Sequence, residues 1–423
     1  MNQDASDPVE QLKQAWKQED AALFEQVLHR HPELKQRINE PVAAFDSPLI
    51  TQVRGRQMLD VLLEAGANIN ARSSWWAGGF GLLDNATPEL ARYAIERGAI
   101  VDAHSAARLG LLGKLKELVA ADPAMVNSRG GDGQTPLHFA GSVAVAEYLL
   151  DHGAGIDLLD VDHESTPAQY MVRDRQEVLH YLIQRGCRTD LLMASAIGDV
   201  SLVKKHLERN PDCIHMRVNN QYFPMQNKKA GGTIYQWTLG FHVSAHQVAK
   251  QFGHNSVLDL LMKRSPPDLK LIEACWMGDK AQVNALVKNR PDLISEMKNS
   301  YARHVADAAR NNNTPAVHLM LAAGAPVDAT GQHGATPLHW AAFHGNVEMI
   351  EAILAYKPPL EILDADFHGS PLGWAIHGSQ EGWYCRSGNY AGAAELLLEA
   401  GAKRPEKISG SEPVQKVLRA HPE

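Results

Sequence analysis

The stretch Gly133-Gln-Thr-Pro-Leu-His-Phe-Ala140 occurs a second time, almost unchanged, as Gly334-Ala-Thr-Pro-Leu-His-Trp-Ala341. Its threonine can cap a helix with the side-chain oxygen, and the proline suits the first helical position, where a missing N–H costs nothing. The leucine and the alanine three residues later share one helix face, and the small alanine lets a neighbouring helix approach closely. Each copy therefore predicts the start of a helix that stacks on its neighbours.

A second recurring phrase predicts where a following helix ends. It reads Leu-Leu-Glu-Ala-Gly-Ala at 62–67 and 397–402 and Leu-Leu-Asp-His-Gly-Ala at 149–154, with looser versions at Gly98, Gly186 and Gly324. The glycine suits the left-handed position that closes a helix, and a polar stretch that turns outward as a hairpin follows it. Successive copies lie about 30 residues apart, which is a repeat-protein period. The predicted unit is helix, turn, helix, hairpin.

These phrases closely resemble the ankyrin-repeat family, and the match is nearly complete at 331–345. Other copies are degenerate, with Gly373 and Gln169 where the family has histidine. The resemblance implies an all-α fold, an ankyrin-repeat solenoid of about 11–12 helix-turn-helix repeats with β-hairpin fingers and two aromatic inserts.

The repeat phrases also predict the organisation of the chain. We expect an N-terminal degenerate or capping repeat, a first array, an extended finger, a second array that contains an insert, and a C-terminal capping helix. Capping segments are expected because the ends of a solenoid must cover its apolar faces. The five predicted segments are 1–40, 41–217, 218–242, 243–405 (with the insert at 378–389) and 406–423. Individual repeats are predicted at 10–40, 41–73, 74–102, 103–130, 131–160, 161–189, 190–217, 243–268, 269–298, 299–330, 331–363 and 364–405.

Function is sought where the chain departs from its own period. Residues 73–85 lack the Thr-Pro start and carry two adjacent tryptophans, of which one is expected to face outward. In 218–242, the pair Gly231-Gly232 suits a hairpin turn, and the alternation that follows it predicts a strand. Either this finger braces its neighbours or its aromatic residues close one side of a groove. The insert 378–389 is either a surface loop or a lid.

The family pattern implies that residues after the Thr-Pro-Leu-His phrase line the concave face of the solenoid. The candidate binding residues carried over in this way are Phe139, Tyr170, Arg173, Trp276, Arg310, Trp340, Phe343, His344, Trp374 and His377, beside Met277 and Asn311. Aromatic residues dominate the energetic centres of interfaces, so this enrichment favours recognition. The alternative is that Trp340 and Trp374 only pack on each other between repeats.

Composition narrows the classes of function. A net charge of -8 and a pI near 6.2 argue against nucleic-acid binding by phosphate neutralisation. No apolar run has the length of a membrane span, and the acidic start of the chain does not resemble a secretory signal. The four scattered cysteines favour reduced thiols. We expect a cytoplasmic protein, and the predicted caps favour a monomer.

Neither a metal site nor a cofactor is predicted. The resemblance implies that His138 and His339 hydrogen-bond backbone between repeats, and the other histidines show no metal-ligand spacing. The string Asp160-Val-Asp-His-Glu164 pairs acids with an imidazole, and His163 stands where the family has glycine. No nucleophile, phosphate-binding loop or metal motif accompanies it, so a catalytic role is not predicted.

The leading hypothesis is a binding scaffold that captures a protein partner on the aromatic-rich concave groove. The alternative is an enzyme or small-molecule receptor whose pocket is formed by the concave face and the inserts 218–242 and 378–389. A purely structural tether is a third possibility. The resemblance does not decide among them, because the fold carries no chemistry of its own.

Overall fold

The structure is a computed structural model that describes residues 7–293 and 298–421. Residues 1–6, 294–297 and 422–423, which belong to the predicted capping segments and to the 269–298 repeat, lie outside the described residues. The chain divides into two compact units. Unit 1 comprises Met1–Met193 and Asn219–Thr238, and unit 2 comprises Ala194–Val218 and Leu239–Glu423. Each unit is described by itself.

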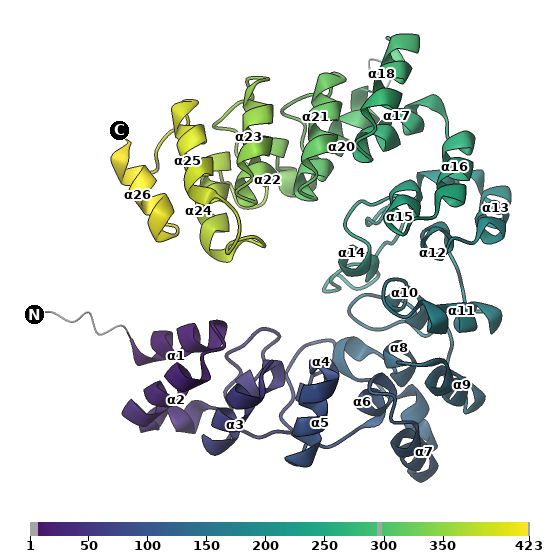
Figure 1. Cartoon of the computed structure of the whole chain (residues 1–423), viewed down its shortest axis with the longest axis vertical. Coiled ribbons are helices and arrows are strands. Elements are labelled where there is room, and N and C mark those ends of the chain that lie inside the picture. Colours follow the sequence, from purple (N-terminus) through teal and green to yellow (C-terminus); the bar gives the residue numbers. More distant parts are fainter. Residues whose placement is uncertain (1–6, 294–297, 422–423) are drawn as a thin grey trace, which may run out of the picture. The chain divides into compact units, whose positions relative to one another are not determined.

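Unit 1 is a succession of short helices (Figure 1). Its α-helices are α1 (Pro8–Lys17), α2 (Ala21–Arg30), α3 (Arg56–Glu64), α4 (Leu82–Asn85), α5 (Pro88–Glu96), α6 (Ala103–Arg108), α7 (Leu112–Ala121), α8 (Pro136–Phe139), α9 (Val143–Asp151), α10 (Pro167–Tyr170), α11 (Gln176–Gln184) and α14 (Tyr235–Thr238). The 3-10 helices η1 (Pro32–Arg37), η2 (Leu49–Gln52), η3 (Pro123–Asn127) and η4 (Gly131–Gly133) lie between them.

Unit 2 continues the same pattern. The helix α12 (Leu191–Ala196) crosses the boundary between the units. It is followed by α13 (Val200–Arg209), η5 (Pro211–His215), α15 (Ala245–Gln251), α16 (Asn255–Arg264), α17 (Pro267–Trp276), α18 (Lys280–Asn289), α20 (Lys298–Arg310), α21 (Thr314–Ala322), η6 (Gln332–Gly334), α22 (Pro337–Phe343), α23 (Val347–Leu354), α24 (Pro371–Glu381), α25 (Tyr390–Glu399) and α26 (Glu412–Ala420).

The recurring phrases form the helix ends that they predict. In α22, the Thr336 hydroxyl accepts a hydrogen bond from the His339 N–H, and Pro337 occupies the first helical position. In the helix that follows, the Asn346 side chain accepts from the Met349 N–H at 3.0 Å. Gly401 follows α25 with φ +103°, the left-handed conformation that glycine adopts without strain.

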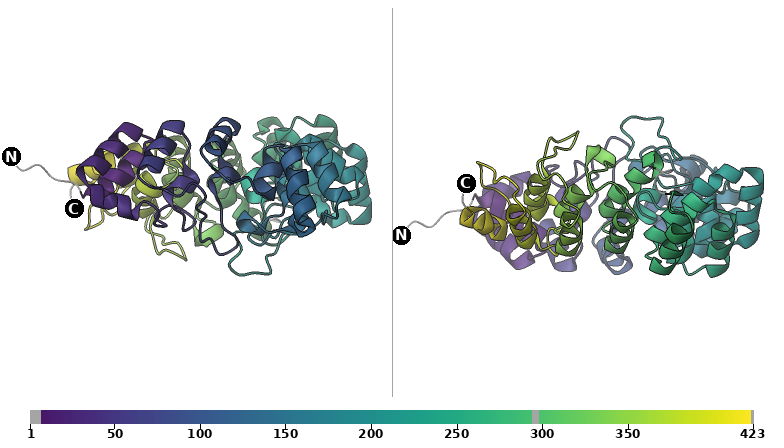
Figure 2. Two further views of the ribbon diagram at one scale, coloured as in Figure 1. Left: turned by 90° about the horizontal axis from the view of Figure 1, so that it is seen from below. Right: turned by 90° about the horizontal axis from the view of Figure 1, so that it is seen from above.

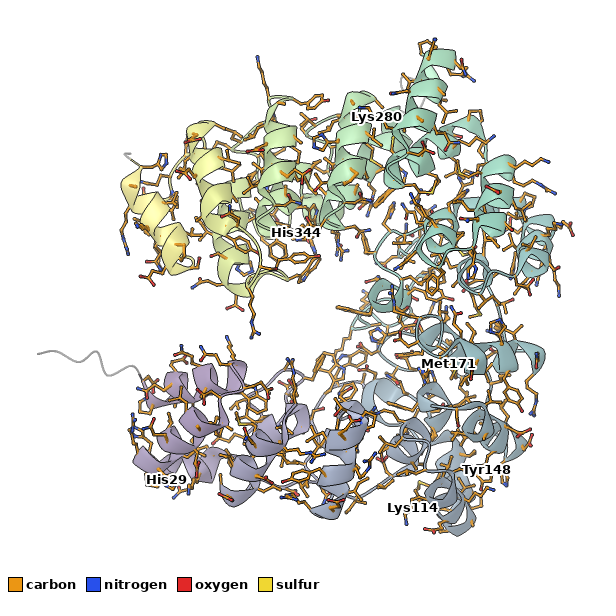
Figure 3. All side chains as sticks on the ribbon, viewed as in Figure 1. His29, Lys114, Tyr148, Met171, Lys280 and His344 are labelled. Carbon is orange, nitrogen blue, oxygen red and sulfur yellow. The ribbon has the colours of Figure 1, made fainter. Side chains whose placement is uncertain are left out.

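Neighbouring helices pack through small and aliphatic side chains. In unit 2, Leu338, Ala341 and Ile350 are fully buried in one continuous core. Figure 2 shows successive helix pairs stacked side by side within each unit. Figure 3 labels Met171 and His344, which are buried, and exposed residues such as Lys114 in α7 and Lys280 at the start of α18. The fold is therefore all-α, as predicted.

The predicted β-hairpin fingers are not confirmed. The described residues contain isolated β-bridges but no strand. Two of the fingers are tight loops in which backbone hydrogen bonds join the ends, Gly130 N to Gln134 O at 2.8 Å and Gly331 N to Ala335 O at 2.9 Å. These loops are too short for a ladder, because a ladder needs several paired residues on each side.

The strand predicted in 218–242 is wrong. After Gly232 the chain forms α14, a single helical turn. The side chain of Tyr235 is fully buried, and its hydroxyl donates to Asp190 Oδ2 at 2.9 Å. The Ile234 N–H donates to the Ser165 hydroxyl at 3.1 Å. The N–H groups of Gln236 and Trp237 donate to the carbonyls of Thr233 and Ile234 within the turn, so the segment satisfies its backbone without a sheet partner.

Two other aperiodic segments also take definite forms. Trp75 and Trp76 are both half-buried in the loop before α4. The prediction that one of the two tryptophans faces outward is therefore not confirmed. Their rings lie 6.2 Å apart, and Trp75 also contacts Phe45 at 5.1 Å. The insert 378–389 begins as the last turn of α24 and continues as a loop.

Among the described residues, no helix is both long and apolar enough to cross a membrane.

Candidate functional site

The predicted binding residues divide between the two units. Phe139, Tyr170 and Arg173 belong to unit 1, and the other seven belong to unit 2. Within unit 2, six of the seven lie in one contiguous aromatic cluster around Trp340, and Trp276 lies apart from it. A single groove lined by all ten residues stays a prediction, and each unit is considered separately.

Trp340 forms the floor of the unit 2 cluster. Its indole is only 3% exposed and meets the Trp374 ring edge-on at a centroid distance of 5.0 Å. Trp374 is 7% exposed, and its Nε1–H donates to Asp364 Oδ2 at 2.9 Å. Packing between adjacent repeats, the alternative that the sequence left open for these two tryptophans, therefore describes their main contacts.

Exposed aromatic side chains lie over this floor. Trp383, from the insert 378–389, is 58% exposed and stacks on Trp340 at 5.9 Å. Phe367 is 68% exposed and contacts Trp374 at 6.3 Å. We call the accessible set the aromatic patch. It consists of Phe343, Phe367, His377, Trp383 and Tyr384.

Arg310, at the end of α20, places a cation beside the patch. Its guanidinium carbon lies 3.9 Å from the Phe241 ring centroid, 5.5 Å from Trp340 and 5.2 Å from Trp383. Burial lowers the pKa of Arg310 to about 10, so the group remains charged at neutral pH. Cation–π contacts with these rings compensate part of its lost hydration.

Trp276 occupies a different position on unit 2. It is buried at the end of α17, and its ring lies 6.5 Å from that of His242. Together with Met277 and Asn311 it lines a separate surface cavity of about 520 Å³. The structure therefore does not place Trp276 in the aromatic patch.

His344 connects the patch to the backbone of the preceding helix pair. Its Nε2–H donates to the Arg310 carbonyl at 2.9 Å, and its ring meets Tyr384 edge-on at 5.1 Å. The imidazole is almost fully buried, and burial lowers its pKa to about 4. His344 is thus neutral at physiological pH and acts as a hydrogen-bond donor to backbone.

This burial predicts how His344 contributes to stability as pH changes. Because its folded pKa lies below the unfolded value of about 6.5, the unfolded state binds more protons as pH falls from about 6.5 to about 4. The wild-type chain should therefore lose up to about 3 kcal/mol from this group over that window. His344→Gln keeps a donor without the titration. Denaturant unfolding at several pH values should show the two stabilities converging toward pH 4, and parallel curves would contradict the assignment.

In unit 1, Phe139 and Tyr170 line a cavity of about 720 Å³. Arg54 faces the same cavity, as do the half-buried guanidinium of Arg175 and the buried imidazole of His138. Arg175 uses its donors on the carbonyls of His138 and Ala140. Arg173 does not line this cavity. It is exposed, and its guanidinium donates to the Thr238 carbonyl of the insert.

Beside this cavity, Asp132, Asp162 and His163 form a buried group that we call the acid–histidine cluster. His163 Nε2 lies 3.7 Å from Asp132 Oδ2 and 3.8 Å from Asp162 Oδ2. Burial raises the pKa of Asp132 to about 6, even though His163 acts in the opposite direction. Asp132 also lines the cavity, so the cluster and the cavity share one wall.

The neighbours of the cluster hold it in place. Asp160 Oδ2 accepts from the His163 backbone N–H at 2.8 Å and from the Tyr170 hydroxyl at 3.1 Å. Burial, followed by the nearby Asp160 carboxylate, raises the pKa of Tyr170 well above its usual value. Tyr170 is therefore a neutral donor, and the acids around His163 are fixed by backbone and side-chain hydrogen bonds.

The two histidines of the recurring phrase have the same geometry. His138 Nδ1 accepts from the Thr135 N–H at 3.0 Å, and its Nε2–H donates to the Ser165 carbonyl at 3.2 Å. His339 repeats this with Thr336 at 3.1 Å and Gly369 at 3.0 Å. Both ring nitrogens are occupied by backbone, as the resemblance implies.

Several residues of these sites, among them Trp383, Phe367 and Asp132, were not among the predicted binding residues. Trp383 and Phe367 could have been found from the aromatic content of the insert and of the loop before α24. Asp132 offers no such signal, because aspartate before glycine is ordinary turn chemistry.

Two segments of the chain, 103–192 and 305–407, match the family model described as ankyrin repeats (3 copies). The chain is 25% identical over 247 residues to the E3 ubiquitin-protein ligase KEG of Arabidopsis thaliana. It is 25% identical over 238 residues to the ankyrin repeat protein nuc-2 of Neurospora crassa. The alignments cover 54% and 53% of this chain but only 15% and 21% of those two proteins.

Proposed function

Because the chain belongs to the ankyrin-repeat family, whose repeats generally mediate protein–protein interaction, we propose that it is a binding scaffold. The finer proposal is that the aromatic patch of unit 2 captures a segment of a protein partner. Arg310 supplies a positive charge beside the patch, suited to a backbone carbonyl or an acidic side chain of that segment.

The observation that carries this proposal is the clustering of exposed aromatic side chains. The large exposed aromatics among the described residues of unit 2 are Tyr356, Phe367, Trp383 and Tyr384, and all but Tyr356 belong to the patch. Isolated surface aromatics are common, whereas a contiguous group supported by buried rings is typical of an interface.

The packing of the patch also favours binding energetically. Trp383 is held by stacking on Trp340 at 5.9 Å and by an edge-on contact with Phe343 at 5.4 Å. A side chain that is already ordered loses less conformational entropy when a partner arrives. Trp383 therefore suits the role of an anchor.

The test compares variants that change only exposed rings. Trp383→Ala and Phe367→Ala should each reduce capture at least about tenfold, the effect of removing an interface anchor. Tyr356→Ala is the matched control, because Tyr356 is 46% exposed and lies outside the patch. Affinity purification from native cells with quantitative mass spectrometry would identify proteins enriched by wild type and by the control. If both patch variants retain the same proteins, the proposal fails.

A second candidate function is favoured by the cavity in unit 1. Its volume of about 720 Å³ suits a small molecule, and cationic, imidazole and phenol groups face it together. A compound retained in the native mass spectrum of the purified chain would support a small-molecule receptor. None of the described residues that line the cavity belongs to 218–242 or 378–389, so this candidate needs neither insert.

A further inference from the structure

The acid–histidine cluster joins parts of unit 1 that are distant in the sequence. Asp132 lies in η4, Asp162 and His163 lie in the next loop, and the segment around Gly231 comes from the insert. The Asp132 carbonyl accepts from the Val161 N–H at 2.8 Å, which ties the two loops together. Asp162 Oδ1 accepts from the Gly231 N–H at 3.1 Å, which ties the insert to them.

One hydrogen bond fixes which nitrogen of His163 faces the acids. His163 Nδ1 lies 2.8 Å from the Gly232 carbonyl oxygen, and a carbonyl can only accept, so Nδ1 carries a hydrogen. The Nε2 atom then faces the carboxylates of Asp132 and Asp162 at 3.7 and 3.8 Å, which is too long for hydrogen bonds. Metal-binding histidines typically donate their second nitrogen to a carbonyl in this way.

The carboxylates lack full compensation in this arrangement. Asp132 is 9% exposed, and its Oδ1 is buried without a hydrogen-bond partner. The Nε1–H of the neighbouring Trp75 is likewise buried without a hydrogen-bond partner. Asp162 and His163 are 6% and 8% exposed. Two adjacent buried carboxylates are costly unless a positive charge, either a protonated His163 or a bound cation, lies between them.

The ligand atoms have the spacing that such a charge requires. One nitrogen and two carboxylate oxygens all lie within 4.8 Å of one another. Ligands about 2.1 Å from a common ion in tetrahedral geometry are about 3.4 Å apart. The two histidine–carboxylate separations of 3.7 and 3.8 Å must therefore close by a few tenths of an ångström, and the two carboxylate oxygens must close by up to about 1.4 Å. Imidazole combined with carboxylates suits zinc among the common divalent ions.

We propose that Asp132, Asp162 and His163 bind one divalent transition-metal ion, with Zn²⁺ as the best match, which fastens the insert to the two loops. Three protein ligands leave one coordination position for water or a ligand. The proposal concerns unit 1 and is independent of the aromatic patch.

The experiment uses the full chain after removal of metal by a chelator. Equilibrium dialysis with Zn²⁺ should give one tightly bound equivalent, and Co²⁺ in its place should give the visible absorption of a low-symmetry site. Asp132→Asn and Asp162→Asn should each weaken Zn²⁺ binding at least about tenfold. Both preserve shape. Asparagine tolerates the positive φ of 53° at position 132, and the amide oxygen introduced by Asp162→Asn still accepts from the Gly231 N–H.

The control is His29→Ala, which removes an exposed histidine that lies 3.5 Å from Glu25 and could hold surface zinc. It should leave the bound equivalent unchanged. Absence of stoichiometric binding, or equal binding by wild type and both asparagine variants, would overturn the proposal. Circular dichroism of the metal-free proteins checks folding. If a variant is unfolded, ¹⁵N NMR of wild-type histidines decides: one imidazole should shift with the first equivalent of Zn²⁺, and no such shift would overturn the site.

Discussion

Replacement of Glu273 by alanine is expected to destabilise unit 2 by about 3–5 kcal/mol. Glu273 lies in α17 with no exposed surface, and its Oε1 is paired with the Arg217 guanidinium. Its Oε2 accepts from the Ser244 hydroxyl at 2.7 Å. Alanine leaves the Arg217 cation buried at 5% exposure without its counter-charge, and that desolvation is the source of the cost.

Amide hydrogen exchange is the suitable measurement, because repeat units open locally and each helix reports its own stability. Protection should fall in α15 and α17, which carry Ser244 at a cap and Glu273. Glu117→Ala is the control. Its ion pair with Lys114 is exposed, so a loss of less than about 1 kcal/mol is expected. A similarly small effect of Glu273→Ala would contradict the importance of the buried pair.

The fold could be predicted because its signals are local. The Thr-Pro-Leu-His phrase encodes a cap, a first helical residue and an inter-repeat hydrogen bond within four positions, as seen at Thr336 and His339. Glycine at the end of the second helix encodes a left-handed residue, as at Gly401. The fingers were predicted less well, because whether a short polar loop forms a strand depends on pairing partners beyond itself.

The candidate sites depended on contacts that no local pattern contains. Trp340 and Trp383 are both aromatic residues outside any motif, yet one is 3% and the other 58% exposed. Which ring is covered depends on how the insert folds back over α22. The acid–histidine cluster needs Asp132 and His163 to meet across one repeat, so its ligands show no recognisable spacing in the sequence.

Replacement of Trp340 by alanine is expected to cost about 3–5 kcal/mol, because it opens a cavity beneath Trp374, Phe343 and Trp383. Trp383→Ala removes a largely exposed ring and should cost less than about 1 kcal/mol. Chemical denaturation followed by far-ultraviolet circular dichroism measures both.

This contrast decides which variant can report on binding. Loss of capture by Trp340→Ala alone would be ambiguous, because the surface itself would be disturbed. Loss of capture by Trp383→Ala, in a chain of nearly wild-type stability, would reflect a contact with the partner. If Trp340→Ala proves as stable as wild type, Trp340 is not the floor of the patch. The inference that stacking on Trp340 holds the Trp383 side chain in place is then wrong.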